Sequence, residues 1–232
     1  MKIKVKNLNP GDRFGYGMKS AIVLDKMGDG VLCMVVDENY QCEFGKGNNN
    51  FAESTLRTEL NSRYMRQWID AGADANDFVV MEVDLTADDG LDDYGTCKCY
   101  LAPRTCDQHR KYRKLISICD SWEWTATPYS TKSNGDFQIV RDVDTGGSLS
   151  SNHACNSGWV RPLFKLKPDT EVEVERTDET NDGISLMDTM KRLVDESSRN
   201  HQSPAQAESK HRCFCFELPR MRIRTQPRCA WV

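Results

Sequence analysis

From Trp122 to Leu166 the chain alternates short β-rich runs with turn-forming residues, and this alternation restricts the fold more than any other feature. The runs cover Trp122 to Thr125, Phe137 to Val140, Gly147 to Leu149 and Val160 to Leu166. The connections between them are rich in Ser, Asn, Asp, Gly and Thr, residues that favour turns and loops. The segment therefore predicts several short strands.

The N-terminal part of the chain predicts a second group of strands. Its β-rich runs are Ile3 to Val5, Ser20 to Leu24 and Val31 to Val36. Turn residues separate them at Asn9 to Asp12 and at Gly28 to Gly30. These features predict a hairpin that opens a small sheet, and the run from Val79 to Leu85 predicts one further strand.

A helix is expected from about Ala52 to Ala71. Asn50 followed three positions later by Glu53 has the form of a capping box. The residues that then recur every four positions along one helical face are Leu56, Leu60, Tyr64 and Trp68. Gly72 is a suitable C-terminal stop, because glycine readily adopts the left-handed conformation that ends many helices.

A second helix is predicted to begin at Thr105, which with Gln108 gives another capping-box pattern. It is expected to continue through Arg113 to about Ile118. Its inward residues should be Tyr112, Leu115 and Ile116. We interpret its charges, carried by Arg110, Lys111, Arg113 and Lys114, as a solvated face and not as a nucleic-acid site.

The composition of the 232 residues is compatible with one large domain that carries appendages. Hydrophobic residues make up 38% and charged residues 28%, which excludes a wholly disordered protein. No apolar stretch approaches the ~18 to 20 residues of a membrane span, and no signal-peptide core is seen at the N-terminus. We expect a protein that is cytoplasmic as synthesised, with the virion or a surface as alternative destinations.

The C-terminal part of the chain differs in composition from the rest. Arg176 to Gly183 predicts a charged linker, Ile184 to Val194 a short amphipathic helix, and Glu196 to Lys210 a disordered segment. Residues 199–232 hold seven Lys or Arg against two acids, whereas the remainder holds 24 basic against 33 acidic residues. We therefore divide the chain into a folded domain over residues 1–175 and a poorly ordered, basic extension over residues 176–232.

An acidic loop follows the strand predicted at Val79 to Leu85. Its carboxylates belong to Asp88, Asp89, Asp92 and Asp93. They lack the alternate-position spacing and the closing Glu of a calcium-binding EF-hand loop. A solvated loop is therefore favoured over a calcium site.

Motifs of catalysis are absent from the sequence. It has no phosphate-binding glycine loop, no nucleophile elbow and no paired-histidine motif. Two sets of residues could in principle bind zinc: Cys97, Cys99, Cys106 and His109, and also His211, Cys213, Cys215 and Cys229. Neither has the usual ligand pairs separated by two to four residues, so ordinary thiols are the favoured interpretation. We predict no catalytic residue, no metal site and no cofactor.

The segment from Trp122 to Pro162 has apolar, rigid ends and a middle of small polar residues. A scaffold that presents interchangeable side chains to a partner has this layout, because strands fix the backbone while loops carry the contacts. A merely solvated loop region would look similar. The pattern alone does not decide between these two interpretations.

A family resemblance favours the first of these interpretations, a scaffold that displays interchangeable side chains to a partner. The motifs are N-x-x-x-S-x-L-R-x-x-L-N from Asn50, HRKYRKLI from His109, WEWTATPYS from Trp122, VRDVDTGGSL from Val140 and VRP from Val160. As a set they resemble the DUF6273 family, lectin-like proteins of gut bacteria and their prophages. The resemblance covers about Lys4 to Val174.

The resemblance implies an α+β, C-type-lectin-like domain with two helices and short, twisted antiparallel strands. The same fold occurs in formylglycine-generating enzymes and in the variable proteins of diversity-generating retroelements. In those elements, error-prone copying of template adenines rewrites codons for the ligand-binding face. The reactive cysteine pair of the formylglycine-generating enzymes has no counterpart here, so enzymatic activity is not implied.

The genetic code offers a check on diversification. Randomising the adenines of an Asn codon can yield Asn, Ser, Asp, His, Cys, Tyr, Gly or Arg, but never Gln or Trp. Positions that belong to this set are Asp136, Arg141, Asp142, Asp144, Ser150, Ser151, Asn152, His153, Cys155, Asn156 and Ser157. They interleave with residues that a scaffold must keep, such as Val140 and Leu149.

The predicted function is non-enzymatic binding of a protein or glycan by the surface formed between residues 129 and 159. The expected contact residues are Tyr129, Asp136, Gln138, Arg141, Asp142, Asp144, Ser150, Ser151, Asn152, His153, Cys155, Ser157 and Trp159. Tyr129, Arg141 and Trp159 are the expected energetic anchors, because such residues dominate binding hot spots. The scaffold is assigned to Trp122, Trp124, Val160, Arg161 and Pro162, with Arg161 paired to a carboxylate.

Two other functions stay open. A phage-encoded regulator or host-defence inhibitor would act through contacts of the basic tail, Arg199 to Arg228, with protein or RNA. A metal-dependent enzyme would use the cysteine clusters. The first would lose activity on deletion of residues 199–232, and the second would hold stoichiometric metal.

Overall fold

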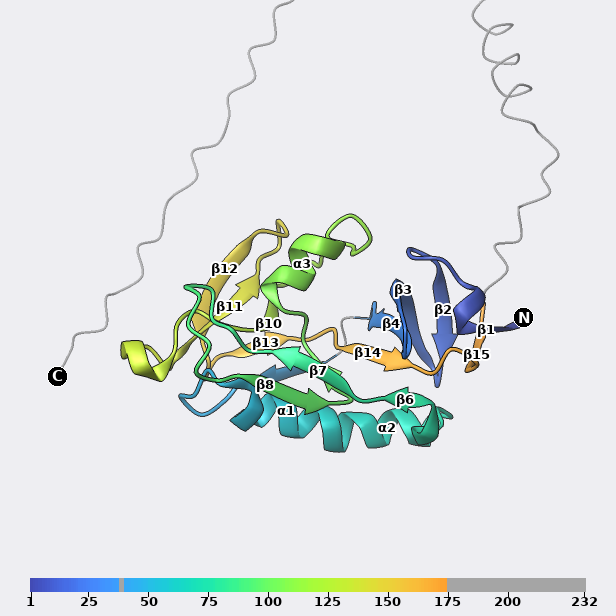
Figure 1. The fold of residues 1–232 in the computed structure, drawn as a ribbon, viewed down its shortest axis with the longest axis horizontal. Helices are drawn as coiled ribbons and strands as arrows, with labels where there is room; N and C mark the ends of the chain where they lie inside the picture. The colour runs from blue at the N-terminus through green and yellow to red at the C-terminus, as the bar shows by residue number, and fades with distance from the viewer. Residues whose placement is uncertain (38–39, 175–232) are drawn as a thin grey trace, which may run out of the picture. The chain divides into compact units, whose positions relative to one another are not determined.

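The computed structural model describes residues 1–37 and 40–174, which form a mixed α+β structure made mostly of strands (Figure 1). The α+β class predicted from the sequence is confirmed for this part of the chain. The linker, amphipathic helix and poorly ordered basic tail predicted within residues 176–232 lie outside the described residues.

The largest sheet contains eight strands. Seven follow the order β1-β15-β2-β3-β4-β14-β6, and β9 also pairs with β14. Their bounds are β1 Lys2–Lys4, β2 Arg13–Tyr16, β3 Lys19–Met27, β4 Gly30–Val35, β6 Phe78–Val79, β9 Leu101–Ala102, β14 Leu163–Leu166 and β15 Glu171–Glu173. β1 pairs only with β15, with Ile3 opposite Val172, so the first and last described strands lie side by side.

A second sheet has five strands in the order β12-β11-β10-β13-β5. Their bounds are β5 Gln41–Glu43, β10 Glu123–Pro128, β11 Ile139–Val143, β12 Leu149–His153 and β13 Ser157–Trp159. All pairings are antiparallel except that of β10 with β13. A separate two-stranded sheet joins β7 Met81–Asp84 to β8 Thr96–Cys99.

The strands predicted from the sequence are present, with shifted limits. The N-terminal hairpin is confirmed as β3 and β4, which turn at Gly28 and Asp29. The single strand predicted from Val79 to Leu85 is instead divided at Val80, and its two halves join different sheets. The last predicted strand begins only at Leu163, after Pro162, which has no N–H to donate to a ladder.

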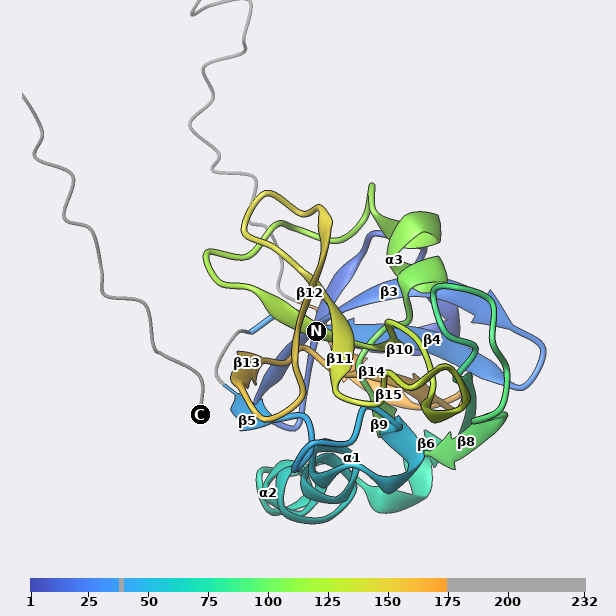
Figure 2. The same ribbon diagram turned by 90° about the vertical axis from the view of Figure 1, so that its left-hand side faces the viewer.

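The long predicted helix lies along one side of the strands (Figures 1 and 2). It consists of α1 Thr55–Glu59, a π-helical segment Leu60–Tyr64 and α2 Met65–Asp70. The predicted inward residues Leu56, Leu60, Tyr64 and Trp68 are all buried. Gly72 ends the helix with a φ of 103°, and its N–H donates to the carbonyl of Ile69.

The predicted start of this helix was wrong. Asn50 caps a short 3-10 turn, Phe51–Glu53, by accepting from the N–H of Ala52. The helix itself begins one turn later, where the hydroxyl of Ser54 accepts from the N–H of Arg57. Both residue types cap well, so the spacing alone could not tell which one precedes the α-helix.

The second predicted helix is α3, Cys106–Tyr112, and its capping box is confirmed. The hydroxyl of Thr105 accepts from the N–H of Gln108, whose side-chain oxygen accepts from the N–H of Thr105. The helix is shorter than predicted, because the chain turns back after Tyr112. Leu115 and Ile116 nevertheless pack against the core, as expected.

Trp68 lies at the centre of an aromatic cluster in the core. Its ring meets the rings of Phe78 and Phe164 edge to face, with centroids 5.2 Å and 4.7 Å away. Its indole N–H donates to the carbonyl of Tyr16 at 2.7 Å, so the one polar atom of this buried side chain is satisfied. These contacts fasten α2 to the large sheet.

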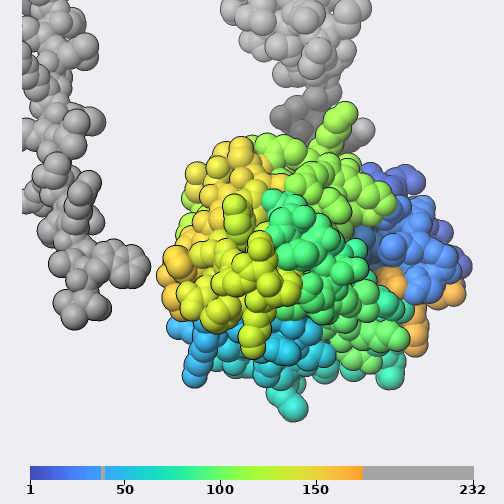
Figure 3. Space-filling model, turned by 60° about the vertical axis from the view of Figure 1, so that its left-hand side comes forward, coloured from blue at the N-terminus to red at the C-terminus, as the bar shows by residue number. Residues whose placement is uncertain are grey.

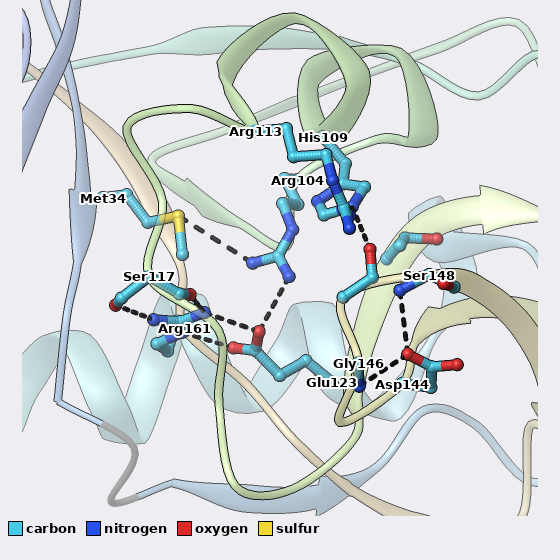
Figure 4. Close-up of polar contacts among 12 residues, drawn as sticks. Met34, Arg104, His109, Arg113, Ser117, Glu123, Asp144, Gly146, Ser148 and Arg161 are labelled. Atoms are coloured by element: carbon cyan, nitrogen blue, oxygen red, sulfur yellow. Dashed lines mark hydrogen bonds and ion pairs between the residues drawn. The ribbon is translucent and has the colours of Figure 1, made fainter.

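A buried ion-pair group joins the small sheet to the rest of the domain (Figure 4). The Glu123 carboxylate, at the start of β10, accepts from Arg104 Nη2 at 2.7 Å and from Arg161 Nε and Nη2 at 2.5 Å and 2.8 Å. All three residues are at most 3% exposed. Burial raises the pKa of Glu123, but the two guanidinium groups outweigh this effect and lower the pKa to about 2. The predicted pairing of Arg161 with a carboxylate is thus confirmed.

Glu123→Gln should lower the free energy of unfolding by about 3–5 kcal/mol, because two buried guanidinium groups lose their countercharge. Arg161→Ala should act in the same direction. Urea unfolding at pH 7 measures both effects, and Glu171→Gln on the exposed face of β15 is the matched control, with a change within about 0.5 kcal/mol. A stable Arg161→Ala protein would contradict the structural role of this group.

Candidate functional site

The predicted display surface, residues 129–159, comprises the loop of residues 129–138, the β11–β12 hairpin, and the turn that leads into β13. Figure 3 shows the loop, in yellow-green, beside the acidic loop of residues 88–93. In the hairpin, Ile139 lies opposite His153 and Arg141 lies opposite Ser151. Directly opposite residues of antiparallel strands share one face, so these four side chains belong to the same surface.

A buried asparagine holds the loop in place. Asn49 is fully buried, and its Nδ2 donates to the carbonyls of Ser130 and Ile139, both at 2.9 Å. Its backbone N–H donates to the carbonyl of Phe137, and its Oδ1 accepts from the hydroxyl of Tyr94. One side chain therefore satisfies carbonyl groups at both ends of the loop.

The acidic loop supports the display loop from outside. Asp89 accepts from the hydroxyl of Ser130, and Asp93 accepts from the hydroxyls of Thr131 and Ser133. These bonds lower the pKa of Asp93, with the contact to Thr131 the largest cause. Asp89 and Asp93 are exposed, as the solvated-loop interpretation predicts, and in addition they accept hydrogen bonds from hydroxyl groups of the display loop.

Arg141 connects three parts of the site. Its Nη1 donates to the hydroxyl of Ser151 at 2.6 Å, and its Nε lies 3.3 Å from Oδ2 of Asp88. Its guanidinium carbon is 5.9 Å from the ring centre of Tyr129, within the range of a cation–π contact. The Arg141 side chain is only 16% exposed, whereas Tyr129 is 46% exposed. Arg141 therefore supports the surface from below, and Tyr129 is open to a partner.

Further predicted residues surround this group. Gln138 and His153 are exposed, and Asp136 holds the loop through its Oδ1, which accepts from the N–H groups of Gln138 and Ile139. Phe137, which was not predicted as a contact residue, is 39% exposed. We call the group formed by Tyr129, Phe137, Gln138, Arg141, Ser151 and His153 the hairpin surface.

Asp142 does not belong to this surface. It lies opposite Trp124 on the inner face of β11 and is 2% exposed, so the prediction that it contacts a ligand is corrected. Its Oδ1 has no hydrogen-bond partner among the described residues. Burial raises the pKa of Asp142 to about 6, against the opposing effect of the neighbouring Arg141 guanidinium.

Ser150 and Asn152 lie on β12, as Ser151 and His153 do, but on the opposite face of the strand. They lie opposite Asp142 and Val140, so the pleat directs them away from Ser151 and His153. Asp144 lies at the far end of the hairpin, where its Oδ1 accepts from the N–H groups of Gly146 and Ser148. Its role is to close the turn.

The remaining predicted residues lie farther along the chain. Cys155 is exposed in the turn before β13, and Ser157 and Trp159 lie on β13, which pairs with β5 on the other side of β10. Gly158 packs directly on Trp122: a Cβ there would lie 2.4 Å from the indole ring. The predicted contact residues therefore divide between the hairpin surface and β13.

The thiols and imidazoles of the described residues are not grouped into a metal site. Among residues 1–37 and 40–174, no three His, Cys, Asp or Glu side chains are grouped so that they could hold a metal ion. This result includes the set of Cys97, Cys99, Cys106 and His109. Burial raises the pKa of Cys99 to about 12, so its thiol is protonated at neutral pH. The second candidate set, from His211 to Cys229, lies outside the described residues.

In the part of the chain that the structure describes, no helix is both long and apolar enough to cross a bilayer.

Asn49→Ala should lower the free energy of unfolding by about 2–3 kcal/mol, because two loop carbonyls and the Tyr94 hydroxyl lose their buried partner. Amide hydrogen exchange should also quicken within residues 130–138. Asn48→Ala is the matched control, since the partly exposed Asn48 side chain binds Glu53 and the N–H of Asn50, neither of which lies in the loop. Equal losses for the two variants would show that Asn49 has no special role in the loop.

Asp142 should make the stability of the fold depend on pH. Its pKa rises from 3.8 to about 6 on folding, so between these values the folded protein binds more protons than the unfolded one, and stability falls as pH rises. Asp142→Asn should remove this fall and stabilise the protein by up to about 3 kcal/mol at pH 7, with no gain below pH 4. Urea unfolding from pH 4 to pH 7 tests this, with exposed Asp120→Asn as control. A variant less stable than wild type at pH 7 would show that the ionised carboxylate is needed.

Comparison with known proteins adds no assignment: no family model, no curated protein and no solved structure matches the chain.

Proposed function

We propose that this protein is a non-enzymatic ligand-binding protein of phage or prophage type, which contacts a protein or glycan through the hairpin surface. The proposal includes a C-type-lectin-like fold and diversification of the exposed residues by a retroelement. It excludes Asp142 from the contacts and gives Arg141 a supporting role. Cys155, Ser157 and Trp159 would form a second, adjoining part of the contact region.

The observation that carries the proposal is a polar loop that is exposed yet held at many points. Asn49, Asp89 and Asp93 bind the loop through its carbonyls and hydroxyls, and none of them belongs to it. Two aromatic rings, those of Tyr129 and Phe137, remain exposed on this support. A loop that is already held in place favours binding, because little conformational entropy of its backbone is lost when a partner covers the aromatic rings.

The division of exposed and buried positions also suits a variable surface. On β11, partly exposed Ile139 and Arg141 alternate with buried Val140 and Asp142, and every residue of β12 is exposed or partly exposed. Val140 and Val143, by contrast, are buried and anchor β11. Replacement of exposed side chains changes stability little, usually within about 0.5 kcal/mol, whereas replacement of buried ones costs more. A partner-specific surface could therefore change without loss of the fold.

Sequencing this locus across related isolates tests the proposal. Changes should concentrate at the exposed or partly exposed codons 129, 151, 153, 155 and 157, and at positions where a nearby template repeat carries adenine. Codons 140 and 143, in the same segment but buried, serve as the internal control and should stay constant. Natural variants that differ only at the exposed codons should bind different members of a glycan or protein array. Uniform variation along the gene would contradict diversified binding.

A further inference from the structure

A cavity of about 310 Å³ lies between α3, the chain that follows it, and the beginning of β10. Figure 4 shows several of the side chains that surround it. The lining residues that carry charge or can ionise include Arg104, His109, Arg113, Glu123 and Arg161. Its volume is at the lower end of the range found for small-molecule sites, roughly 300–1,000 Å³. This cavity is separate from the hairpin surface.

The lining carries an excess of positive charge. Three arginines, Arg104, Arg113 and Arg161, line the cavity together with one acid, Glu123; the side chains of Arg104, Arg161 and Glu123 are at most 2% exposed. Burial and the nearby Arg104 lower the pKa of His109, so the imidazole is neutral at pH 7 and adds no charge to the lining. The entry of an anion into the cavity would therefore be electrostatically favourable.

The Glu123 carboxylate is already engaged, since it accepts three bonds from Arg104 and Arg161. Arg104 Nε is buried and has no hydrogen-bond partner among the described residues, and the same holds for Nδ1 of His109. Arg113 lies at the exposed side, with Nη1 3.0 Å from His109 Nε2. His109 Nε2 also lies 3.0 Å from the carbonyl oxygen of Gly147, and a neutral imidazole that donates there has no N–H at Nδ1. The donors that remain for a second acceptor are Arg104 Nε and the other N–H groups of Arg113.

The other walls are apolar. Ile116, Ile118 and Val143 line the cavity beside the cationic group, and Ile118 is 63% exposed at its edge. Inorganic phosphate would leave these side chains without an apolar partner, whereas the apolar body of an organic anion would cover them. The planar guanidinium groups suit the two oxygens of a carboxylate.

We infer that this cavity binds a small organic carboxylate, with its carboxylate toward Arg104 and Arg113 and its apolar body against Ile116, Ile118 and Val143. The inference does not depend on the proposed display function. Its ligand enters beside α3 and leaves the hairpin surface free.

Calorimetric titration of the full chain with benzoate at pH 7 tests the inference. Benzoate should bind with saturation, and benzamide, which has the same shape without the charge, should bind at least about tenfold more weakly, since a charged hydrogen bond contributes about 1.5–3 kcal/mol. Arg113→Gln should weaken benzoate binding about tenfold for the same reason. Lys114→Gln, an exposed cation next in the chain that does not line the cavity, is the matched control and should stay within about twofold.

A second variant separates a loss of benzoate binding from a loss of folding. Ile118→Asp places a negative charge at the exposed edge and should weaken benzoate binding while urea unfolding stays as in the wild type. The inference is overturned if benzoate does not saturate, if benzamide binds as well, or if Arg113→Gln and Lys114→Gln have equal effects. Phosphate that binds more tightly than benzoate would likewise overturn the carboxylate assignment.

Discussion

The rest of the domain depends on the buried ion pairs that the Glu123 carboxylate forms with Arg104 and Arg161. This carboxylate joins β10 to two segments that are distant in sequence, because Arg104 is 19 residues and Arg161 is 38 residues away. β10 in turn pairs with β11 and β13, so the hairpin and the second contact region both rest on a strand held by this group. One carboxylate facing two buried guanidinium groups also leaves the positive charge that surrounds the neighbouring cavity. The same residues thus fix the sheet and determine which ligands that cavity favours.

The hairpin surface shows a different principle of support. The core of the domain is apolar and aromatic around Trp68, but the loop of residues 129–138 is held by amide, carboxylate and hydroxyl groups. Polar contacts of this kind specify geometry as well as stability, because each requires a partner at a defined distance and direction. An irregular loop can therefore keep one conformation while side chains such as Tyr129 and Phe137 stay exposed.

The sequence predicted local features better than distant contacts. The apolar face from Leu56 to Trp68 and the capping box at Thr105 depend on residues within a few positions, and both were confirmed. The pairing of Arg161 was also predicted, since a buried cation needs a countercharge, although its partner could not be named. Asn49 was missed because it acts on carbonyls 81 and 90 residues away, which no spacing rule reveals. Arg104 gave one overlooked signal, a cation directly after the apolar run Leu101 to Pro103.

The pairing of β1 with β15 affects how this chain can fold during translation. Among the described strands β1 pairs with β15 alone, and this partner ends at Glu173. The ribosome must therefore release almost all of the described residues before the N-terminal strand can find its place. Pairing of strands so distant in the sequence is slow, because closing a long loop costs conformational entropy before the native contacts form. Until then the edge of β2 stays unpaired, and the nascent chain exposes backbone groups that chaperones or neighbouring chains can bind.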